Sequence, residues 1–457
     1  MEPACLLGVI ADDYTGGSDV AAMLSEHGAR AVQVFGLQEP GFIQELRGRY
    51  RAAVICLKSR SNPAAEARQQ SIEALGLLEL LEPRQIHFKY CSTFDSTPEG
   101  NIGPVIDALM SRMGIDFTVA VPALPVNERT QYLGHLFVGP LLLSESHMRH
   151  HPVTPMTDSS VVRLLRAQTG RRVGLIPLEA VQAGAGRLAA EVERARQSGV
   201  EIALVDAVTD ADVAAIAEAC ADLRLITGSS ALPMCLPAVW RSRGWLGEWH
   251  SLQAVPAVDD RSPFRSERGS VSNAGRTPPV LVLSGSCAAS TLRQVEELRA
   301  SGCRCEALDA ARLVQGGAGA ELDRLYERLR TEVMAAGAAA IVASADHLTR
   351  EQTRRGLSAE QAAALPRAIE AAFGELARRF AADGVERLVI AGGETAGAVI
   401  DALGIRAVEV TAILDPGVPA VRAIGGPSLR LALKSGNFGS PDFFPTAIRC
   451  LTEAADG

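Results

Sequence analysis

Two adjacent carboxylates follow the first apolar run of the chain. The stretch ADDYTGGSD places Asp12 and Asp13 directly after the run Leu6 to Ala11, and Thr15 and Gly16 lie in the turn that follows. A carboxylate at such a strand end can accept a proton from a substrate hydroxyl or hold Mg²⁺. An Asp that caps the N-terminus of the next helix is the structural alternative.

Two further polar turns repeat this arrangement. Lys58 and Arg60 belong to LKSRSNP, and Lys89 opens KYCSTFDSTPEGN at the end of another apolar run. The cations could bind the carboxylate of an acidic substrate, and the hydroxyl and amide groups its alcohols. Two such turns in one region make plain solvated loops the weaker alternative. The short polar residues of the second turn are Ser92, Thr93, Asp95, Ser96 and Asn101.

Lysine is rare in this chain. Lys+Arg number 45, and the lysines are Lys58, Lys89 and Lys434. Each lies in a polar turn, which suggests positions that need a compact ammonium group rather than a guanidinium. Chance is the alternative.

A histidine-rich stretch, HMRHHPVTPMTDS, lies between the polar turns and the middle of the chain. His147 and His151 are four residues apart, but no Cys is near and HExxH is absent, so we do not expect zinc. His151, Thr154 and Asp158 either line a pocket or belong to a surface loop.

The second half of the chain has three turns rich in glycine and hydroxyl groups. Ser284 and Ser286 follow the run PVLVL, Gly392 to Thr395 follow LVIA, and Gly436 follows Lys434. Glycines let a backbone approach phosphates closely, and a following helix supplies free N–H donors. The three turns predict a polyphosphate site, although GxxxxGK[ST] and GxGxxG are both absent.

The elements that must position these residues alternate between short β-branched runs and helical stretches, which predicts mainly parallel sheets flanked by helices. Residues 251–278 are polar and aperiodic, as in a linker. We therefore expect two unlike α/β domains, 1–250 and 279–457, with the active-site cleft between them. The predicted strands are 6–11, 31–35, 53–57, 85–89, 117–121, 202–205, 223–227, 280–283, 339–343, 388–391, 407–411 and 429–433; helices are predicted at 16–27 and 289–300.

Composition excludes several classes of protein. The 457 residues carry a formal charge of -8 and only 4% are aromatic, so we do not expect nucleic acid as a partner. The N-terminus has no basic leader and no apolar run approaches the roughly 20 residues of a membrane span, which predicts a cytoplasmic protein without a membrane partner. Nine scattered cysteines fit reduced thiols.

Together these motifs resemble the four-carbon acid sugar kinase family. The matching stretches, in order from residue 7 to 444, are IADDYTGGSDVA, LKSRS, KYCSTFDSTPEGNIGPV, PALPVNERTQYLGHLFV, MRHHPVTPMTDS, LSGSC, AGGETAGAV, DPGVP and LKSGNFGSPDFF. The threonate and erythronate branch has K-x-D-S-T-L-R-G-N at the second polar turn. This chain instead has CSTFDST at residues 91–97, similar to the 3-oxo-tetronate 4-kinase branch. The linker and residues 345–361 look longer than in the family.

The resemblance implies an acid-sugar domain, an ATP domain, and transfer of the γ-phosphoryl group to the C4 hydroxyl of a 3-oxo-tetronate. Asp12 or Asp13 would be the base, with Asp95 as a rival, while Lys89 and Arg60 would hold the carboxylate. Mg²⁺ would bridge the phosphates with few protein ligands, and the sequence identifies no metal ligand. Residues expected to contact ATP are Ser284, Ser286, Gly392, Gly393, Glu394, Thr395, Ala396 and Gly436.

Other functions stay open at this point. A D-threonate or D-erythronate 4-kinase would use the same chemistry on a reduced substrate. A nicotinamide-dependent dehydrogenase would need the missing GxGxxG turn, and a non-catalytic sugar-acid sensor would not need the phosphate turns. The stereochemistry at C2 and a homodimeric assembly are both left open.

Overall fold

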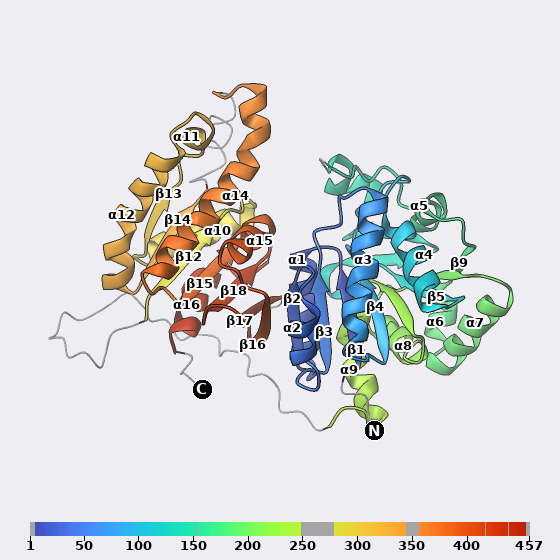
Figure 1. Cartoon of the computed structure of the whole chain (residues 1–457). Helices are drawn as coiled ribbons and strands as arrows, with labels where there is room; N and C mark the ends of the chain where they lie inside the picture. The colour runs from blue at the N-terminus through green and yellow to red at the C-terminus, as the bar shows by residue number, and fades with distance from the viewer. Residues whose placement is uncertain are drawn as a thin grey trace. The chain divides into compact units, whose positions relative to one another are not determined.

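The computed structural model describes residues 5–151, 153–247, 278–343, 356–415, 417–436 and 438–453. The chain divides into two compact units, Met1–Ser251 and Leu252–Gly457 (Figure 1). The predicted linker lies outside the described residues except for its last position, 278.

The first unit is built on an all-parallel sheet. Its strand order is β2-β3-β1-β4-β11-β5-β10-β9. The central strands are apolar along their whole length because helices cover both faces of such a sheet. The strand bounds are β1 Leu7–Ala11, β2 Ala31–Phe35, β3 Ala52–Cys56, β4 Gln85–Lys89, β5 Thr118–Val121, β9 Val173–Ile176, β10 Ile202–Val205 and β11 Leu225–Gly228.

The helices of the first unit pack in two rows (Figure 1). One row contains α1 (Tyr14–Glu26), α9 (Ala231–Ser242), α8 (Asp210–Ala219), α7 (Ala185–Gln197) and α6 (Leu178–Gln182); the other contains α2 (Pro40–Glu45), α3 (Ala64–Glu79), α4 (Ile102–Met113) and α5 (Val161–Gln168). The local sequence determines where several of these helices begin. Asp13 caps α1 by accepting from the Gly16 N–H, and Thr209 forms a capping box with Asp212 at α8.

A small antiparallel sheet follows β5, and the sequence did not predict it. Its strands are β6 (Arg129–Tyr132), β7 (His135–Val138) and β8 (Leu141–Leu142). The buried carboxylate of Asp206 holds the β6–β7 turn by accepting from the N–H groups of Leu133 at 2.7 Å and Gly134 at 3.0 Å. Two short 3₁₀ helices, η2 (Leu143–Glu145) and η3 (His147–His150), then carry the chain to His151.

The second unit has a mixed sheet with the order β13-β14-β12-β15-β18-β17-β16. All pairs are parallel except those of β17, which runs antiparallel to both neighbours. Helices α10 and α16 pack together, and α11, α12, α14 and α15 form a second group. The bounds are β12 Val280–Ser284, β13 Arg304–Ala307, β14 Ala338–Val342, β15 Arg387–Ala391, β16 Ala407–Asp415, β17 Val418–Ile424, β18 Arg430–Lys434, α10 Ala289–Ala300, α11 Ala310–Val314, α12 Ala318–Ala336, α14 Ala359–Ala382, α15 Gly393–Ala402 and α16 Phe443–Glu453.

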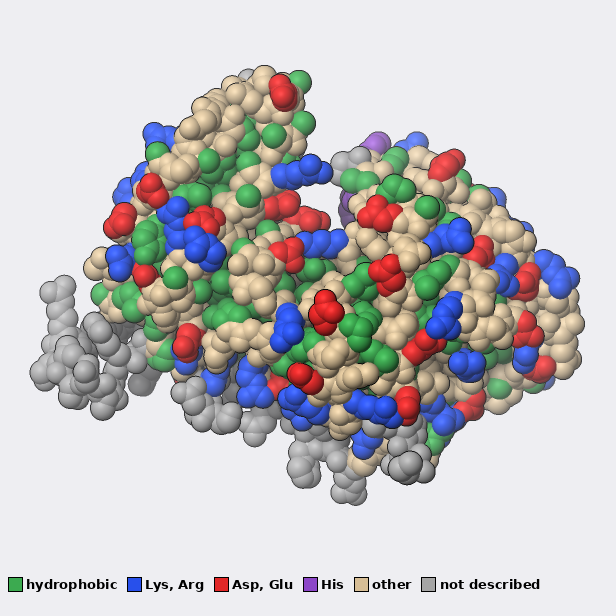
Figure 2. All heavy atoms as spheres, viewed as in Figure 1, with side chains coloured by type: hydrophobic (Ala, Val, Ile, Leu, Met, Phe, Trp, Pro, Cys, Tyr) green, Lys and Arg blue, Asp and Glu red, His purple; other side chains and the backbone are tan. Residues whose placement is uncertain are grey.

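The predicted α/β class with mainly parallel sheets is confirmed. Every predicted strand is present with its ends within two residues, apart from β16, which extends four residues further. The predictions missed β9, β13 and β17 as well as the small sheet. No helix in the described ranges is long and apolar enough to cross a membrane. On the face drawn in Figure 2, acidic and basic side chains are interspersed rather than gathered by sign.

Candidate functional site

Four strand ends of the first unit lie side by side at one edge of its sheet. Ala11 pairs with Cys56 of β3 and with Lys89 of β4, and Lys89 pairs in turn with Gly228 of β11. Because the strands are parallel, the turns after all four meet at the same edge, where α/β sheets bind ligands. The polar turns predicted separately from the sequence are therefore neighbours.

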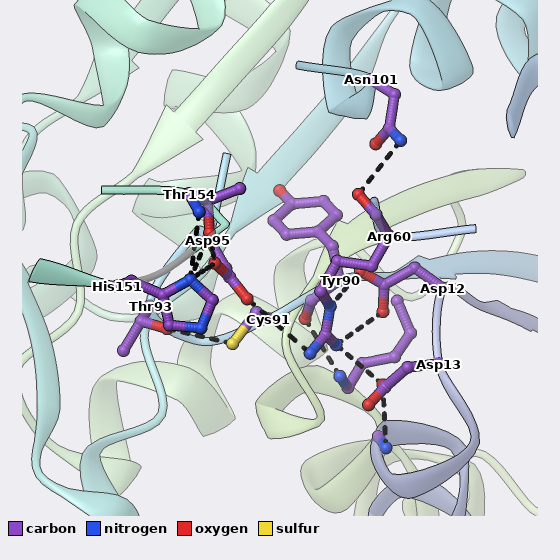
Figure 3. Close-up of polar contacts among 12 residues, drawn as sticks. Asp12, Asp13, Arg60, Tyr90, Cys91, Thr93, Asp95, Asn101, His151 and Thr154 are labelled. Atoms are coloured by element: carbon purple, nitrogen blue, oxygen red, sulfur yellow. Dashed lines mark hydrogen bonds and ion pairs between the residues drawn. The ribbon is translucent and has the colours of Figure 1, made fainter. Parts of the chain in front are cut away.

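Arg60 is at the centre of this edge and contacts three carboxylates (Figure 3). Its Nε and Nη2 donate to the two oxygens of Asp12, each at 2.8 Å, and Nη2 also donates to Asp13 Oδ1 at 2.7 Å. Its Nη1 lies 3.9 Å from Asp95 Oδ2. A planar guanidinium fork matches this bidentate geometry, which a lysine at position 60 would lose.

The two adjacent carboxyl groups have opposite pKa shifts. Burial raises the pKa of Asp12 against the lowering effect of Arg60. Burial alone would raise the pKa of Asp13 as well. The positive charges of Arg60 and Lys89 and the hydrogen bond from the Gly16 N–H outweigh burial, so the pKa of Asp13 is lowered. Asp13 is therefore an ionised helix cap, whereas the shift of Asp12 brings it closer to the range of a general base.

Lys89 is buried beside the first turn of α1. Its Nζ donates to the Tyr90 carbonyl at 3.1 Å, and a Cβ added at Gly16 would lie 2.5 Å from that nitrogen. A side chain at position 16 would therefore displace the Lys89 ammonium or the Asp13 carboxylate from its position.

Sequence reasoning missed two residues beside Lys89. Asp19, on α1, has its pKa raised by burial, and Ser230 Oγ donates to its Oδ2. Its Oδ1 is buried without a hydrogen-bond partner in the described structure. The signal was available, because Gly228, Ser229 and Ser230 follow a strand just as the other polar turns do.

Asp95 lies in a strained turn that brings it to the histidine-rich stretch. Phe94 and Asp95 both have positive φ, 61° and 39°, a conformation that costs free energy and often marks functional loops. Thr154 Oγ1 donates to Asp95 Oδ1, and His151 Nδ1 lies 3.5 Å from the same oxygen (Figure 3). Asp158, in contrast, turns away to bind Arg163 at the start of α5.

The remaining predicted site residues of the first unit have different structural roles. Asn101 donates to the carbonyls of Ser59, Arg60 and Asn62, so it holds the Arg60 turn in place. Ser96 is buried and accepts from Gln168, and the Thr93 hydroxyl lies 3.0 Å from Cys91 Sγ. Lys58 is exposed over the Tyr14 ring, and Thr15 and Ser92 are half-buried.

The three glycine-rich turns of the second unit also meet. Ser284, Ala391 and Lys434, the last residues of β12, β15 and β18, align in register. The turns bond to each other through the backbone: Gly285 N–H and Ser286 N–H donate to Ala391 O at 3.0 and 3.2 Å. The turn after β15 donates from Gly392 N–H to Lys434 O at 2.8 Å.

Side chains larger than hydrogen would separate these turns. A Cβ at Gly285 would lie 1.9 Å from Thr395 Oγ1, and one at Gly436 would lie 2.6 Å from Ser286 Oγ. Gly392 has a φ of 117°, which disfavours any other residue. Thr395 and Ala396 are buried in α15, Gly393 is half-buried, and Glu394 is exposed in the first turn of that helix.

No group of three or more His, Cys, Asp or Glu side chains that could hold a metal ion occurs within the described ranges. Glu394 in the first turn of α15 and Asp442 before α16 are exposed carboxylates of the segments that follow β15 and β18. This donor set fits a metal ion that arrives with phosphates and takes few protein ligands.

Comparison with known proteins defines the class. Residues 7–236 match the model of a sugar-binding N-terminal domain, and residues 281–444 match that of a nucleotide-binding C-terminal domain. The chain belongs to the protein family built from these two domains. The polar edge around Arg60 thus falls in the sugar-binding part and the glycine-rich turns in the nucleotide-binding part.

Relatives match over nearly the full length. The 3-oxo-tetronate kinase of Cupriavidus necator is 43% identical over 446 residues, covering 98% of this chain and 97% of that protein. The 3-oxo-tetronate kinase of Pseudomonas fluorescens is 42% identical with the same coverage. A solved structure from Salmonella typhimurium LT2 is 38% identical, has a TM-score of 0.82 and covers 96% of this chain and 98% of its own.

Proposed function

We propose that this protein is an ATP-dependent sugar-acid kinase that phosphorylates the C4 hydroxyl of a 3-oxo-tetronate. The observation that carries the proposal is the full-length similarity to 3-oxo-tetronate kinases, which includes both the Arg60 edge and the glycine-rich turns. The chemistry of each part agrees with it. Phosphoryl transfer depends on positioning and charge neutralisation, and each unit offers the groups for one substrate.

Arg60 and Lys89 would bind the carboxylate of the acid. Arg60 has two of its nitrogens engaged by Asp12 and Asp13, while Nη1 faces Asp95 at a longer distance and can bond a ligand. Charge-assisted hydrogen bonds of this kind give strong and geometrically specific binding. The hydroxyl groups of Ser92 and Thr93 and the ring of His151 would bond the remaining oxygens of the substrate.

Asp12 would accept the proton of the C4 hydroxyl, and Asp95 is its rival. The raised pKa of Asp12 favours it, since a base works best when its pKa approaches the working pH. Asp13 is the weaker candidate because its charge caps α1 and its pKa is lowered. Turnover of Asp12→Asn and Asp13→Asn tests this: near-normal rates for both, with intact folds, would leave Asp95 as the base.

ATP would bind at the turns after β12, β15 and β18. Ser284, Ser286, Gly392 to Ala396 and Gly436 line these turns, and the first turn of α15 offers free N–H groups to phosphates. Mg²⁺, when bound, would neutralise charge on the β- and γ-phosphates. Glu394, exposed in the first turn of α15, would be a side chain able to hold it.

The test is ADP release from ATP and Mg²⁺ with freshly generated 3-oxo-tetronate, beside D-threonate, D-erythronate and L-threonate. A strong preference for the oxo-acid supports the proposal. A preference for a reduced acid keeps the kinase and changes the substrate, whereas sugar-acid binding without turnover on any of them points to a sensor. The stereoisomers also report on C2, and light scattering of the purified protein determines whether it forms the homodimer that the sequence left open.

A further inference from the structure

The loop after β18 is arranged around a buried ammonium group. Lys434 Nζ donates to the carbonyls of Ser435 at 3.0 Å, Gly436 at 3.3 Å and Phe438 at 2.9 Å, and to Thr291 Oγ1 at 3.0 Å. The residue is only 2% exposed, and no carboxylate of the described residues forms an ion pair with it. Its partners are neutral, so the ammonium acts here as an internal cation that draws carbonyl oxygens inward.

Helix α10 reinforces the same arrangement from the other side. Gln294 Nε2 donates to the carbonyls of Phe438 at 3.2 Å, Gly439 at 2.8 Å and Ser440 at 2.9 Å. Ser290 and Thr291 donate from their hydroxyls to Gly436 O at 2.9 and 2.6 Å. The carbonyls of this loop are therefore bound from inside the protein.

Inward carbonyls leave particular N–H groups facing outward. In a trans peptide the C=O and the following N–H point in opposite directions. The Ser435 and Phe438 carbonyls point toward Lys434, so the N–H groups of Gly436 and Gly439 point away from it. Neither N–H has an acceptor among the described residues. Outward N–H groups at glycines are suited to bind an anion.

We propose that Lys434 and Gln294 are positioning residues for the nucleotide, holding the loop so that the Gly436 and Gly439 N–H groups bind its phosphates. The inference rests on the proposed function and deepens it. Lys434 supports the loop from behind instead of contacting the phosphates. The neighbouring turn after β12 is tied into the same network, because Thr291 Oγ1 lies 3.2 Å from Ser286 Oγ.

The buried position also makes nucleotide binding sensitive to pH. Burial lowers the pKa of Lys434 to about 8, and Asp415 at the end of β16 acts in the opposite direction. The other groups around Nζ are the Thr291 hydroxyl and, from α16, the Phe443 ring at 6.0 Å. Bound phosphates favour the charged ammonium, so above pH 8 binding must take up a proton and weaken as the pH rises.

The experiment is calorimetric titration of the full chain with ATP and Mg²⁺ between pH 7 and 10, in buffer pairs of different ionisation enthalpy. Above pH 8 the phosphate groups are almost fully ionised, since their last pKa is near 6. We expect the affinity of the unaltered protein to fall above pH 8 by up to tenfold per pH unit, the limit for uptake of one proton, and the buffer pairs to report that uptake.

Variants separate positioning from titration. Lys434→Met should bind ATP at least tenfold more weakly at pH 7 and take up no proton. Gln294→Met should bind weakly but keep the pH profile, and Gln315→Met, at an exposed glutamine of the same unit, should bind normally. Cys287→Ser should keep the proton uptake, which excludes that thiol as its source.

Several results would overturn the inference. Binding that is flat from pH 7 to 10, or normal binding by Lys434→Met, would refute the role of Lys434 while leaving the kinase proposal intact. Loss of proton uptake in Cys287→Ser would assign the titration to the thiol. Absence of ATP binding by the unaltered protein at every pH would instead remove the nucleotide assignment itself, and the inference with it.

Discussion

Replacing Asp12 or Asp13 by Asn should have unequal costs, although the two residues are adjacent and share Arg60. Asp12 receives two charge-assisted hydrogen bonds from Arg60 and is buried. Asn keeps only one acceptor oxygen, and its amide N–H would face a guanidinium N–H. Burial already opposes the charge of Asp12, so the cost comes from the hydrogen bonds: the amide leaves buried N–H groups of Arg60 without an acceptor, and we expect Asp12→Asn to lower the free energy of unfolding by about 3 kcal/mol.

Asp13→Asn should cost about 1 kcal/mol, because Asn caps helices about as well as Asp. Its oxygen can still accept from the Gly16 N–H and from Arg60, and only the charge is lost. The difference of about 2 kcal/mol corresponds to roughly thirtyfold in the unfolding equilibrium.

Urea unfolding followed by tryptophan fluorescence measures this difference for the first structural unit, Met1–Ser251. The three tryptophans are Trp240, Trp245 and Trp249, all within the first unit, so the signal does not mix the two transitions. Linear extrapolation with a common slope gives each free energy. Asp116→Asn is the control: it weakens an exposed ion pair with Arg196, which contributes little to stability, so it should shift the midpoint far less than Asp12→Asn. If Asp13→Asn proves as costly as Asp12→Asn, or costlier, the account of Arg60 as a fork centred on Asp12 is wrong.

Two further predictions concern other parts of the fold. Burial lowers the pKa of His87 to about 3 while its Nε2 bonds to Ser229 O at 3.0 Å, so the folded chain resists the protonation that the unfolded chain undergoes near pH 6.5. Stability of the first unit should therefore fall as the pH drops from 6.5 toward 3, by at most about 1.4 kcal/mol per pH unit from this group. His87→Gln should flatten that part of the urea-derived profile, and an unchanged slope would assign it elsewhere. Gly285→Ala should weaken ATP binding at least tenfold in calorimetry, because its Cβ would collide with Thr395. The control is Gly319→Ala, at an open position in α12, which should bind ATP normally and gain up to about 1 kcal/mol of stability. Normal ATP binding by Gly285→Ala would show that the turns can separate without loss of affinity.

The sequence was enough to predict the polar strand ends and the class of fold. A β-branched run followed by Gly, Ser, Asp or Lys is a local pattern, and the parallel sheet then brings such ends together, as it does for Asp12, Arg60 and Lys89. Short elements with little apolar pattern, such as β13 (RCEA) and the β6–β8 sheet, gave no comparable signal.

The direction of a side chain could not be predicted in the same way. Lys89 and Lys434 each end a strand, and both ammonium groups turn inward onto backbone carbonyls, which the polar sequence around them did not indicate. Arg60 meets Asp12 across 48 positions of sequence, and Asp19 depends on Ser230, 211 positions away. Such pairs are fixed by tertiary packing, which one sequence does not reveal.

The position of β11 has a consequence for how the first unit is made. This strand lies between β4 and β5, although both precede it by more than a hundred residues. On the ribosome, β4 and β5 must therefore wait with open edges until residue 228 has emerged, a long interval in which a chaperone or a neighbouring nascent chain can pair with them. The same strand delivers Ser229 and Ser230 to the polar edge, so the polar edge and the sheet are completed by one late event in synthesis.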